Sequence, residues 1–280
     1  MNKNLIIDAG MHMCEDTSYY LKKGFNVVSI DADINLVNKA KSNYKDYVNK
    51  GTLTILNYAL SSEDNEEITF NISKETLWNS INAEISDRNG NFHEQVSVKT
   101  QKLSSIFKKY GVPYYCKIDL EGYDNIALKT LLEIEKLPKF ISVETECLGE
   151  GQVITEEETL QTLNTLHELG YKKFKLIDQR TLSVLTDIDH TFYTDQPTNF
   201  IGKKLKYLSS KLNQISNYDI KLNYKFPVGS SGHFGEDLKG KWVDYDQARK
   251  SIIKHRTDYF GTNMPLSFGF WCDWHAKLDQ

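Results

Sequence analysis

A regular alternation of short apolar runs with amphipathic segments constrains this chain more than any other feature of its sequence. The apolar runs are LIIDA, NVVSID, TLTIL, YYCKID and FISVE, at residues 5–9, 26–31, 52–56, 114–119 and 140–144. They are apolar on both faces, which is typical of parallel strands covered by helices on either side. Helix-like segments lie between them, at 15–23, 34–48, 103–110 and 125–135. The pattern predicts a doubly wound, mostly parallel α/β sheet of the Rossmann-like kind.

Two departures from this alternation indicate additions to the sheet. Between residues 66 and 101, short β-branched pieces flank the polar loop SDRNGNFH, which favours a β-insertion near the sheet edge. After Gln179 the chain contains a helical stretch at 207–218, the Gly-rich segment FPVGSSGHFGEDLKGKW and a strongly aromatic end. We expect a domain over residues 1–200 and a C-terminal extension over 201–280 that packs on it. The Gly-rich segment is expected to form a lid-like loop of this extension.

Several residues are predicted to begin or end helices. Thr155 is an N-cap for the amphipathic segment 156–169, which has acids in its first turn and stops at Gly170. Asp33 and Asp124 stand where N-caps of the following helices are expected. In the closing WCDWHA, Trp271, Trp274 and His275 are expected to anchor the terminus.

Composition excludes some classes of protein. The net charge of −4 gives no overall attraction to nucleic acid. No apolar run approaches the roughly 18 residues of a membrane span, and the N-terminus turns acidic too early for a signal peptide, so we expect a cytoplasmic protein. The cysteines show no zinc-type pairing, and Asp273 with His275 is too little for a metal site; no metal is predicted.

The turn after the first apolar run resembles a nucleotide-binding turn. It reads DAGMHMCEDT, and Asp31 ends the second run, close to the spacing at which an acid binds ribose hydroxyls. Cys14 stands where a second glycine would be needed to bring a pyrophosphate close, which favours a ligand without phosphates. S-adenosylmethionine fits this description. The candidate cofactor-binding residues here are Asp8, Gly10, His12, Asp31 and Ala32; a simple tight turn and an exposed loop histidine are the alternatives.

The third apolar run is followed by NYALSSEDN, at the edge where open α/β sheets bind ligands. Ala59 and Leu60 are candidates to contact the adenine face, with Ser61 or Ser62 at its edge. An ordinary polar loop is the alternative.

The stretch KIDLEGYD places three carboxylates close together at the end of the fourth run. Like charges this close repel, and a cation or hydroxyl donors at the same place would relieve the repulsion. Asp119 is expected near the charged end of the cofactor, and Asp119 or Glu121 is the candidate general base. The alternative for Glu121 is a cap on the following helix.

Four residues are candidates for contacts with the acceptor. Trp78 offers an indole for a sugar face, with Ser80 beside it, although a core tryptophan is the alternative. Glu144 either contacts the acceptor or pairs with a lysine. His233, in the Gly-rich segment, either binds the acceptor, shares the role of base, or is held by backbone. Six lysines between 203 and 225 form either a solvated face or a site for a phosphate-bearing acceptor.

Together, several segments resemble the FkbM family of S-adenosylmethionine-dependent methyltransferases: DAG, SIDAD, NYALSSEDN, KIDLEGYDNIALKTL, FISVE, SSGHFGEDLKGKW and WCDWHA, spanning Leu5 to Ala276. The resemblance implies cofactor contacts at Asp8, Gly10 and Asp31, with Asp119 beside the methionyl group. It also implies O-methylation of a small hydroxylated acceptor such as a saccharide, a nucleotide- or lipid-linked sugar, or a polyketide-type metabolite. Such enzymes often carry a second glycine where this chain has Cys14.

Other functions remain possible from the sequence alone. They are a nicotinamide-dependent oxidoreductase, a nucleic-acid methyltransferase and a cofactor-binding protein without catalysis. The incomplete glycine fingerprint disfavours the first, and the acidic charge and missing NPPY-type tetrapeptide disfavour the second. The oligomeric state is not predicted.

Overall fold

The computed structural model describes residues 1–74, 79–87, 90–145, 155–179, 181–186, 217–260 and 271–279. The strands are β1 (Asn2–Ala9), β2 (Asn26–Asp31), β3 (Leu53–Asn57), β4 (Ala59–Leu60), β5 (Glu67–Ser73), β6 (Phe92–Gln101), β7 (Pro113–Ile118), β8 (Phe140–Glu144), β9 (Lys173–Asp178), β10 (Ser183–Val184), β11 (Tyr218–Asp219), β12 (Tyr224–Lys225) and β13 (Cys272–Lys277). The helices are α1 (Glu15–Lys22), α2 (Ile34–Asn43), α3 (Lys45–Asn49), α4 (Ala83–Ser86), α5 (Leu103–Tyr110), α6 (Asp124–Lys129), α7 (Glu156–Thr159), α8 (Gln161–Glu168) and α10 (Tyr245–Phe260), with 3₁₀ turns η3 (Thr130–Glu133) and η5 (Gly235–Asp237).

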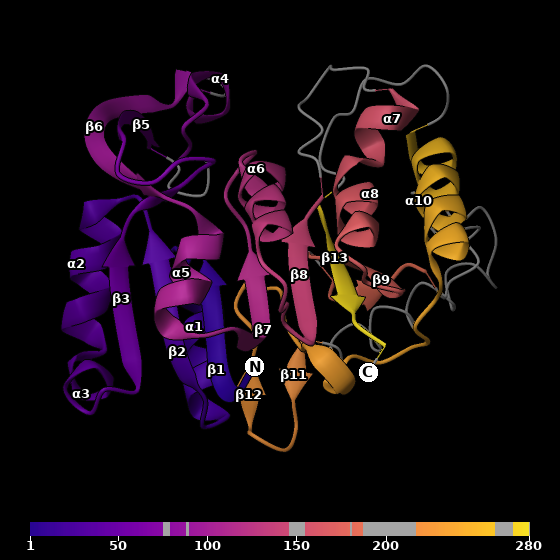
Figure 1. The fold of residues 1–280 in the computed structure, drawn as a ribbon, viewed down its shortest axis with the longest axis horizontal. Coiled ribbons are helices and arrows are strands. Elements are labelled where there is room, and N and C mark those ends of the chain that lie inside the picture. Colours follow the sequence, from indigo (N-terminus) through magenta and orange to yellow (C-terminus); the bar gives the residue numbers. More distant parts are fainter. Residues whose placement is uncertain are drawn as a thin grey trace, which may run out of the picture.

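The central sheet confirms the predicted doubly wound α/β fold. Its eight strands lie in the order β10-β9-β13-β8-β7-β1-β2-β3. β1, β2, β3, β7 and β8 pair in parallel, whereas β13 runs antiparallel to both β8 and β9. From β1 the chain first builds outward through β2 and β3, then continues on the other side through β7 and β8 (Figure 1). The carboxyl ends of β1 and β7 therefore form a switch point, where α/β folds usually bind ligands.

Apolar side chains pack on both faces of the sheet, as its sequence pattern predicts. On β1, Ile7 belongs to the core shared with α5, α6, α8 and α10, whereas its neighbour Ile6 belongs to the core shared with α1 and α2. Successive residues of a strand point to opposite faces, so a strand with helices on both sides must be apolar throughout.

Several predicted helices are shorter than expected. The predicted 34–48 helix is divided at Tyr44 into α2 and α3, and the predicted 125–135 helix ends as the 3₁₀ turn η3. The predicted N-caps at Thr155 and Asp33 are confirmed: Thr155 forms a capping box with Glu158, and the Asp33 carboxylate accepts from the N–H of Asn35. Helical propensity alone does not locate such breaks, because tertiary packing decides them.

The C-terminal segment forms a strand within the central sheet, whereas we expected an extension that packs against the first domain. β13 lies between β8 and β9 and hydrogen-bonds to both, and Trp274 is fully buried at its centre. His275 is also buried, and burial lowers its pKa to about 3. Both residues therefore anchor the terminus, as the sequence predicts.

The Gly-rich segment packs against α1, and its Gly229 lines the pocket described below. Ser230 Oγ and Ser231 N donate to the Asp16 carboxylate at 2.6 and 3.0 Å, and Phe226 and Phe234 join the core around Tyr19. Burying the two aromatic side chains of this segment stabilises its packed position relative to an exposed loop. The helix predicted at 207–218 lies outside the described residues except at its last two positions, where Tyr218 begins β11.

The predicted β-insertion is present as a separate sheet of three strands in the order β4-β6-β5. It rises above the carboxyl ends of β2 and β3, at the upper left of Figure 1. β4 follows directly after β3, so the insertion is held close to the switch point and can supply walls to a pocket there.

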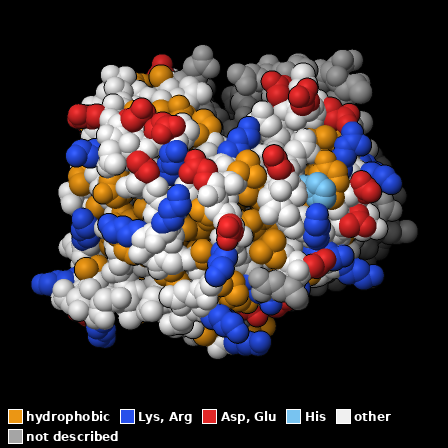
Figure 2. All heavy atoms as spheres, viewed as in Figure 1, with side chains coloured by type: hydrophobic (Ala, Val, Ile, Leu, Met, Phe, Trp, Pro, Cys, Tyr) orange, Lys and Arg blue, Asp and Glu red, His pale blue; other side chains and the backbone are white. Residues whose placement is uncertain are grey.

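The surface carries mixed charge on the face seen in Figure 2, where acidic and basic side chains are interspersed between apolar ones. That face offers no broad basic area among the described residues, unlike the surfaces that bind nucleic acid. Within the same described residues, no helix is both long enough and apolar enough to cross a bilayer.

Candidate active site

A pocket opens at the switch point, where α/β folds usually bind ligands. Its walls come from the ends of β1, β2, β4 and β7, from the insertion, and from two C-terminal positions. The lining residues are Gly10, His12, Glu15, Asp16, Ile30, Asp31, Ala32, Leu36, Tyr58, Ala59, Leu60, Phe70, Asn79, Ile81, Lys117, Asp119, Leu120, Glu121, Tyr123, Gly229 and Trp271.

The turn after β1 brings the ends of β1, β2 and β7 together. Gly10 N and Met11 N donate to the carbonyl of Ile30, and Asp119 N donates to the carbonyl of Ala9. Gly10 has φ +85°, and a Cβ there would lie 1.7 Å from the Asp119 carbonyl oxygen. Glycine is therefore required at this position because the backbone that follows β7 passes too close for a side chain. The sequence alone did not show this reason for the glycine. Cys14 has φ +67°, so it adopts the backbone conformation for which a glycine is usual.

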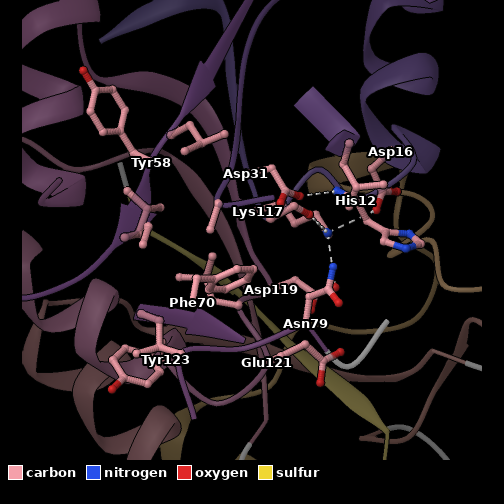
Figure 3. Close-up of a pocket in the computed structure, with 18 of the residues that line it drawn as sticks. His12, Asp16, Asp31, Tyr58, Phe70, Asn79, Lys117, Asp119, Glu121 and Tyr123 are labelled. Carbon is pink, nitrogen blue, oxygen red and sulfur yellow. Dashed lines mark hydrogen bonds and ion pairs between the residues drawn. The ribbon is translucent and has the colours of Figure 1, made fainter. Parts of the chain in front are cut away.

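Asp31 lies in the pocket wall at the end of β2, as predicted. Its carboxylate accepts from His12 N at 2.9 Å (Figure 3). It also accepts from Asp33 N at 2.9 Å. Burial raises the pKa of Asp31 to about 6, although these two hydrogen bonds act in the opposite direction. His12 also lines the pocket, and its Nδ1 lies 3.1 Å from Glu15 Oε1.

The wall next to Asp31 is largely apolar. The predicted Ala32, Ala59 and Leu60 all line it. Phe70 and Tyr58 also contribute, and sequence reasoning missed both because the insertion's position over the sheet cannot be obtained from local pattern. This wall can accept a flat heteroaromatic ring.

Lys117 is a site residue that we did not predict, although a lysine inside the apolar run YYCKID is itself a notable feature. Its Nζ lies 3.2 Å from Asp119, 3.7 Å from Asp16 and 3.9 Å from Asp8, and donates to the carbonyl of Gly10 at 3.1 Å. Burial alone would lower the pKa of Lys117, but these carboxylates outweigh it and hold the pKa well above its usual value. Lys117 is thus a buried cation that links carboxylates on β1, at the start of α1 and after β7.

The placement of Asp8 corrects our expectation that it contacts the cofactor. It is fully buried and lies outside the wall of the pocket, where its Oδ2 accepts from Thr17 Oγ1 at 2.5 Å. Burial raises its pKa to about 7, and Lys117 opposes that rise. The reason is register: Asp8 lies one residue before the strand end, directly beside Lys117 on β7, and not at the tip.

Three carboxylates gather at the ends of β7 and β8. Asp119 and Glu121 line the pocket and Glu144 is buried behind them, and an oxygen of each lies within 4.8 Å of an oxygen of the others. Burial, followed by the charges of Glu121 and Asp119, raises the pKa of Glu144 well above its usual value. The structure thus brings Glu144, from the run FISVE, next to the two carboxylates of KIDLEGYD.

The loop that carries Glu121 is held from two sides. Asp124 accepts from the N–H groups of Leu120 and Gly122 at 2.8 and 3.0 Å, so it ties the loop before α6 and does not act as the N-cap that we expected. Ser80 Oγ donates to the carbonyl of Glu121 at 2.8 Å. Glu121 itself has φ +48°, a conformation that its surroundings must stabilise.

The acceptor candidates have different outcomes. Ser80 holds the loop of Glu121 and lies outside the pocket wall, between Asn79 and Ile81, which do line it. His233 is also outside the wall: its Nδ1 lies 3.1 Å from Tyr19 OH, and its ring packs on Phe226. His233 therefore packs against Tyr19 of α1, and its neighbour in the same segment, Gly229, lines the pocket instead.

Two tryptophans complete the account of the predicted residues. Trp78 lies outside the described residues. Trp271, expected only to anchor the terminus, lines the pocket immediately before β13.

The fold and this pocket define a class of protein: a Rossmann-like α/β protein with a pocket at the switch point of its sheet. A comparison with protein families identifies the particular family, because the domain described as "Methyltransferase FkbM domain" matches residues 8–173. This is more than half of the chain, and the protein belongs to the FkbM methyltransferase family. The match runs from the last two residues of β1 to the first residue of β9. It does not include the Gly-rich segment or β13, which we had expected to belong to the likeness.

Two further comparisons add little. No protein of curated function matches the chain. A solved structure similar to this chain is described as a SAM-dependent methyltransferase from Geobacter sulfurreducens in complex with S-adenosyl-L-homocysteine. The similarity covers 98% of this chain and 83% of that one, at 10% identity and a TM-score of 0.35.

Proposed function

We propose that the protein is an S-adenosylmethionine-dependent O-methyltransferase that acts on a hydroxyl of a small metabolite, such as a saccharide or a nucleotide- or lipid-linked sugar. The observation that carries the proposal is one pocket with Asp31 at the end of β2 and the pair Asp119 and Glu121 beyond the end of β7. Membership of a methyltransferase family supports the reaction class.

The pocket residues suit such a cofactor. The Asp31 carboxylate accepts one backbone hydrogen bond on each oxygen and retains lone pairs for ribose hydroxyls. The apolar wall of Ala32, Ala59 and Leu60 suits an adenine ring. S-adenosylmethionine, when bound, supplies a methyl group on a cationic sulfur. Asp119 is placed to stabilise positive charge at the other end of the pocket.

The acceptor's proton requires a base. Methyl transfer to a hydroxyl forms a C–O bond, breaks the C–S bond and releases the hydroxyl proton, which we assign to Asp119 or Glu121. A well-placed base contributes roughly 100-fold to 10,000-fold to such a step. Tyr123 and Trp271 also line the pocket and offer aromatic side chains for a ring-shaped acceptor.

Asp31→Ala is expected to weaken binding of S-adenosylhomocysteine by about 1 to 3 kcal/mol, because two ribose hydroxyls would lose their acceptor. Isothermal titration calorimetry measures the change. Asp46→Ala, which removes an acid from α3 away from the pocket, is the matched control and should leave the affinity unaltered. Equal affinity of Asp31→Ala and the native protein would mean that Asp31 is not the ribose ligand.

Cofactor affinity is also expected to fall as the pH drops below about 6. The pKa of Asp31 is raised to about 6 in the free protein, and hydroxyl donors stabilise its ionised form, so the pKa in the complex is lower. Binding is therefore strongest above the free-state pKa, and weakens by up to about tenfold per unit below it.

Calorimetry from pH 5 to 8 on the native protein and on Asp31→Asn separates this effect from other titrating groups. His12, Glu15 and Asp33 surround Asp31 and remain in both proteins. Only the native protein should show the additional loss at low pH. Parallel curves would assign the pH dependence to another group.

The reaction itself is tested with a methyl-labelled cofactor and a panel of sugars, nucleotide sugars and polyketide alcohols. Label recovered as an O-methyl group on one acceptor class supports the proposal. Binding of NAD with no binding of S-adenosylhomocysteine would contradict it.

A further inference from the structure

The turn after β1 uses its own N–H groups within the protein. All five N–H groups at residues 10–14 donate hydrogen bonds to other protein groups. Their acceptors are, in order, the carbonyl of Ile30 for the first two, the carboxylates of Asp31 and Glu15, and the carbonyl of Met11. In nucleotide-binding α/β folds this turn normally offers N–H groups to the ligand. Here its N–H groups are already occupied.

The start of α1 is also unsuited to a negatively charged ligand group. Glu15 and Asp16 occupy the first turn of this helix, and both line the pocket. Their carboxylates already interact with the positive end of the helix dipole. The amino-acid group of S-adenosylmethionine carries both an ammonium and a carboxylate. Acids at this place suit the ammonium, so the carboxylate needs donors from another part of the chain.

The Gly-rich segment reaches the same end of the pocket. Figure 3 shows His12 and Asp16 on the side of Asp31 opposite to Tyr58. With the ribose at Asp31 and the adenine against the apolar wall, the amino-acid group of the cofactor extends toward Asp16. Gly229 lines the pocket, and the two residues after it in the chain donate hydrogen bonds to the Asp16 carboxylate.

Gly229 lies in a tight turn that does not use its N–H group. Ser230 N donates to the carbonyl of Pro227 at 3.3 Å, and Gly229 has φ +87°, as the third residue of a type II turn does. The N–H of Gly229 takes no part in that bond and donates to none of the residues that the structure describes. It is therefore available to a ligand in the pocket.

Asp16 fixes the position of this turn. Ser230 Oγ and Ser231 N donate to its carboxylate at 2.6 and 3.0 Å, and Ser230 Oγ also accepts from Gly232 N at 3.1 Å. Asp16, Ser230 and Ser231 are each at most 2% exposed, so water does not weaken these contacts. Lys117 Nζ lies 3.7 Å from Asp16 and offsets a charge that would otherwise repel a carboxylate nearby.

We propose that the N–H of Gly229 binds the carboxylate of the cofactor's amino-acid group, and that Asp16 and Ser230 are the positioning residues that hold it there. This role rests on the proposed function, because it requires S-adenosylmethionine in this pocket. It gives a function to a segment outside residues 8–173, the part that matches the family domain. It also accounts for Cys14, since a turn that does not bind the carboxylate has no need of a second glycine.

Two ligands separate this role from a purely structural one. S-adenosylhomocysteine carries the amino-acid group, whereas 5′-methylthioadenosine has the same nucleoside and sulfur without it. In calorimetry, Ser230→Ala and Asp16→Asn should each weaken binding of S-adenosylhomocysteine by about tenfold or more, and binding of methylthioadenosine by less than about twofold. Ser104→Ala is the matched control, because it removes the contact of a fully buried serine with the carboxylate of Glu133, away from the pocket. It should change neither affinity.

Nuclear magnetic resonance of the Gly229 amide in the native protein tests the contact itself and does not depend on the folding of a variant. The amide proton should move downfield with S-adenosylhomocysteine and much less with methylthioadenosine. The same shift with both ligands, or an equal loss of both affinities in the folded variants, would overturn the proposal. A native protein that binds neither ligand would instead reject the proposed function, and this role with it.

Discussion

Lys117→Met should reduce the free energy of unfolding by about 3 to 5 kcal/mol, the range found when a buried ion pair loses one partner. The side chain of Lys117 is 5% exposed, and its Nζ lies within 4 Å of Asp8, Asp16 and Asp119. Methionine has a similar length but no charge, so packing is largely kept while three acids lose their cation. Burial already raises the pKa of Asp8 to about 7 with the lysine present.

The sign of the pH dependence distinguishes this cause from a packing defect. Burial raises the pKa of Asp8 and of Asp16 in the folded state and Lys117 opposes that rise, so without Lys117 these two pKa values lie further above their unfolded values. Stability contributed by acids of raised pKa is present at low pH and lost as the pH increases. The loss of unfolding free energy caused by Lys117→Met should therefore be larger at pH 8 than at pH 5.

Urea unfolding at both pH values measures this deficit. Lys3→Met, on the exposed end of β1, is the control and should change stability by less than about 0.5 kcal/mol. A deficit of the same size at both pH values would indicate lost packing instead of lost charge compensation.

Asp119→Asn should lower turnover by about 100-fold to 10,000-fold while affecting cofactor affinity much less. Asparagine keeps the shape of the side chain but can neither take a proton nor bind a cation strongly. Asp119 lines the pocket and lies 3.2 Å from the Nζ of the buried Lys117, so its carboxylate is within reach of a ligand there.

Single-turnover rates and calorimetry on the same preparation separate the two effects. Glu121→Gln, measured alongside, shows which of the two carboxylates is the more important. An equal loss of turnover and of cofactor affinity in Asp119→Asn would make Asp119 a binding residue only.

Much of the fold was predictable because the parallel strands of the central sheet are apolar on both faces. β2 and β8 begin and end at the predicted residues, and the edge insertion was recognised from its β-branched pieces. The position of β13 was not predictable, because a strand that returns from the far end of the chain is placed by pairing with β8 and β9. Pairing between strands distant in sequence leaves no local pattern.

The candidate site was predictable where it lies at strand ends. Asp31, Asp119 and Glu121 line the pocket because parallel strands present their carboxyl ends at one edge. Lys117 and Trp271 were missed as site residues, since their roles depend on which neighbours the sheet brings to them. His233 was misplaced because a Gly-rich composition resembles that of a mobile loop, whereas the phenylalanines Phe226 and Phe234 bury this segment under α1.

A crystal structure of the protein with S-adenosylhomocysteine tests the central claim most directly. We predict that the ribose hydroxyls lie within hydrogen-bond distance of the Asp31 carboxylate, with the adenine against Ala59 and Leu60 and the sulfur toward Asp119. A complex in which the nucleoside binds elsewhere, or in which this pocket stays empty at saturating ligand, would contradict the account.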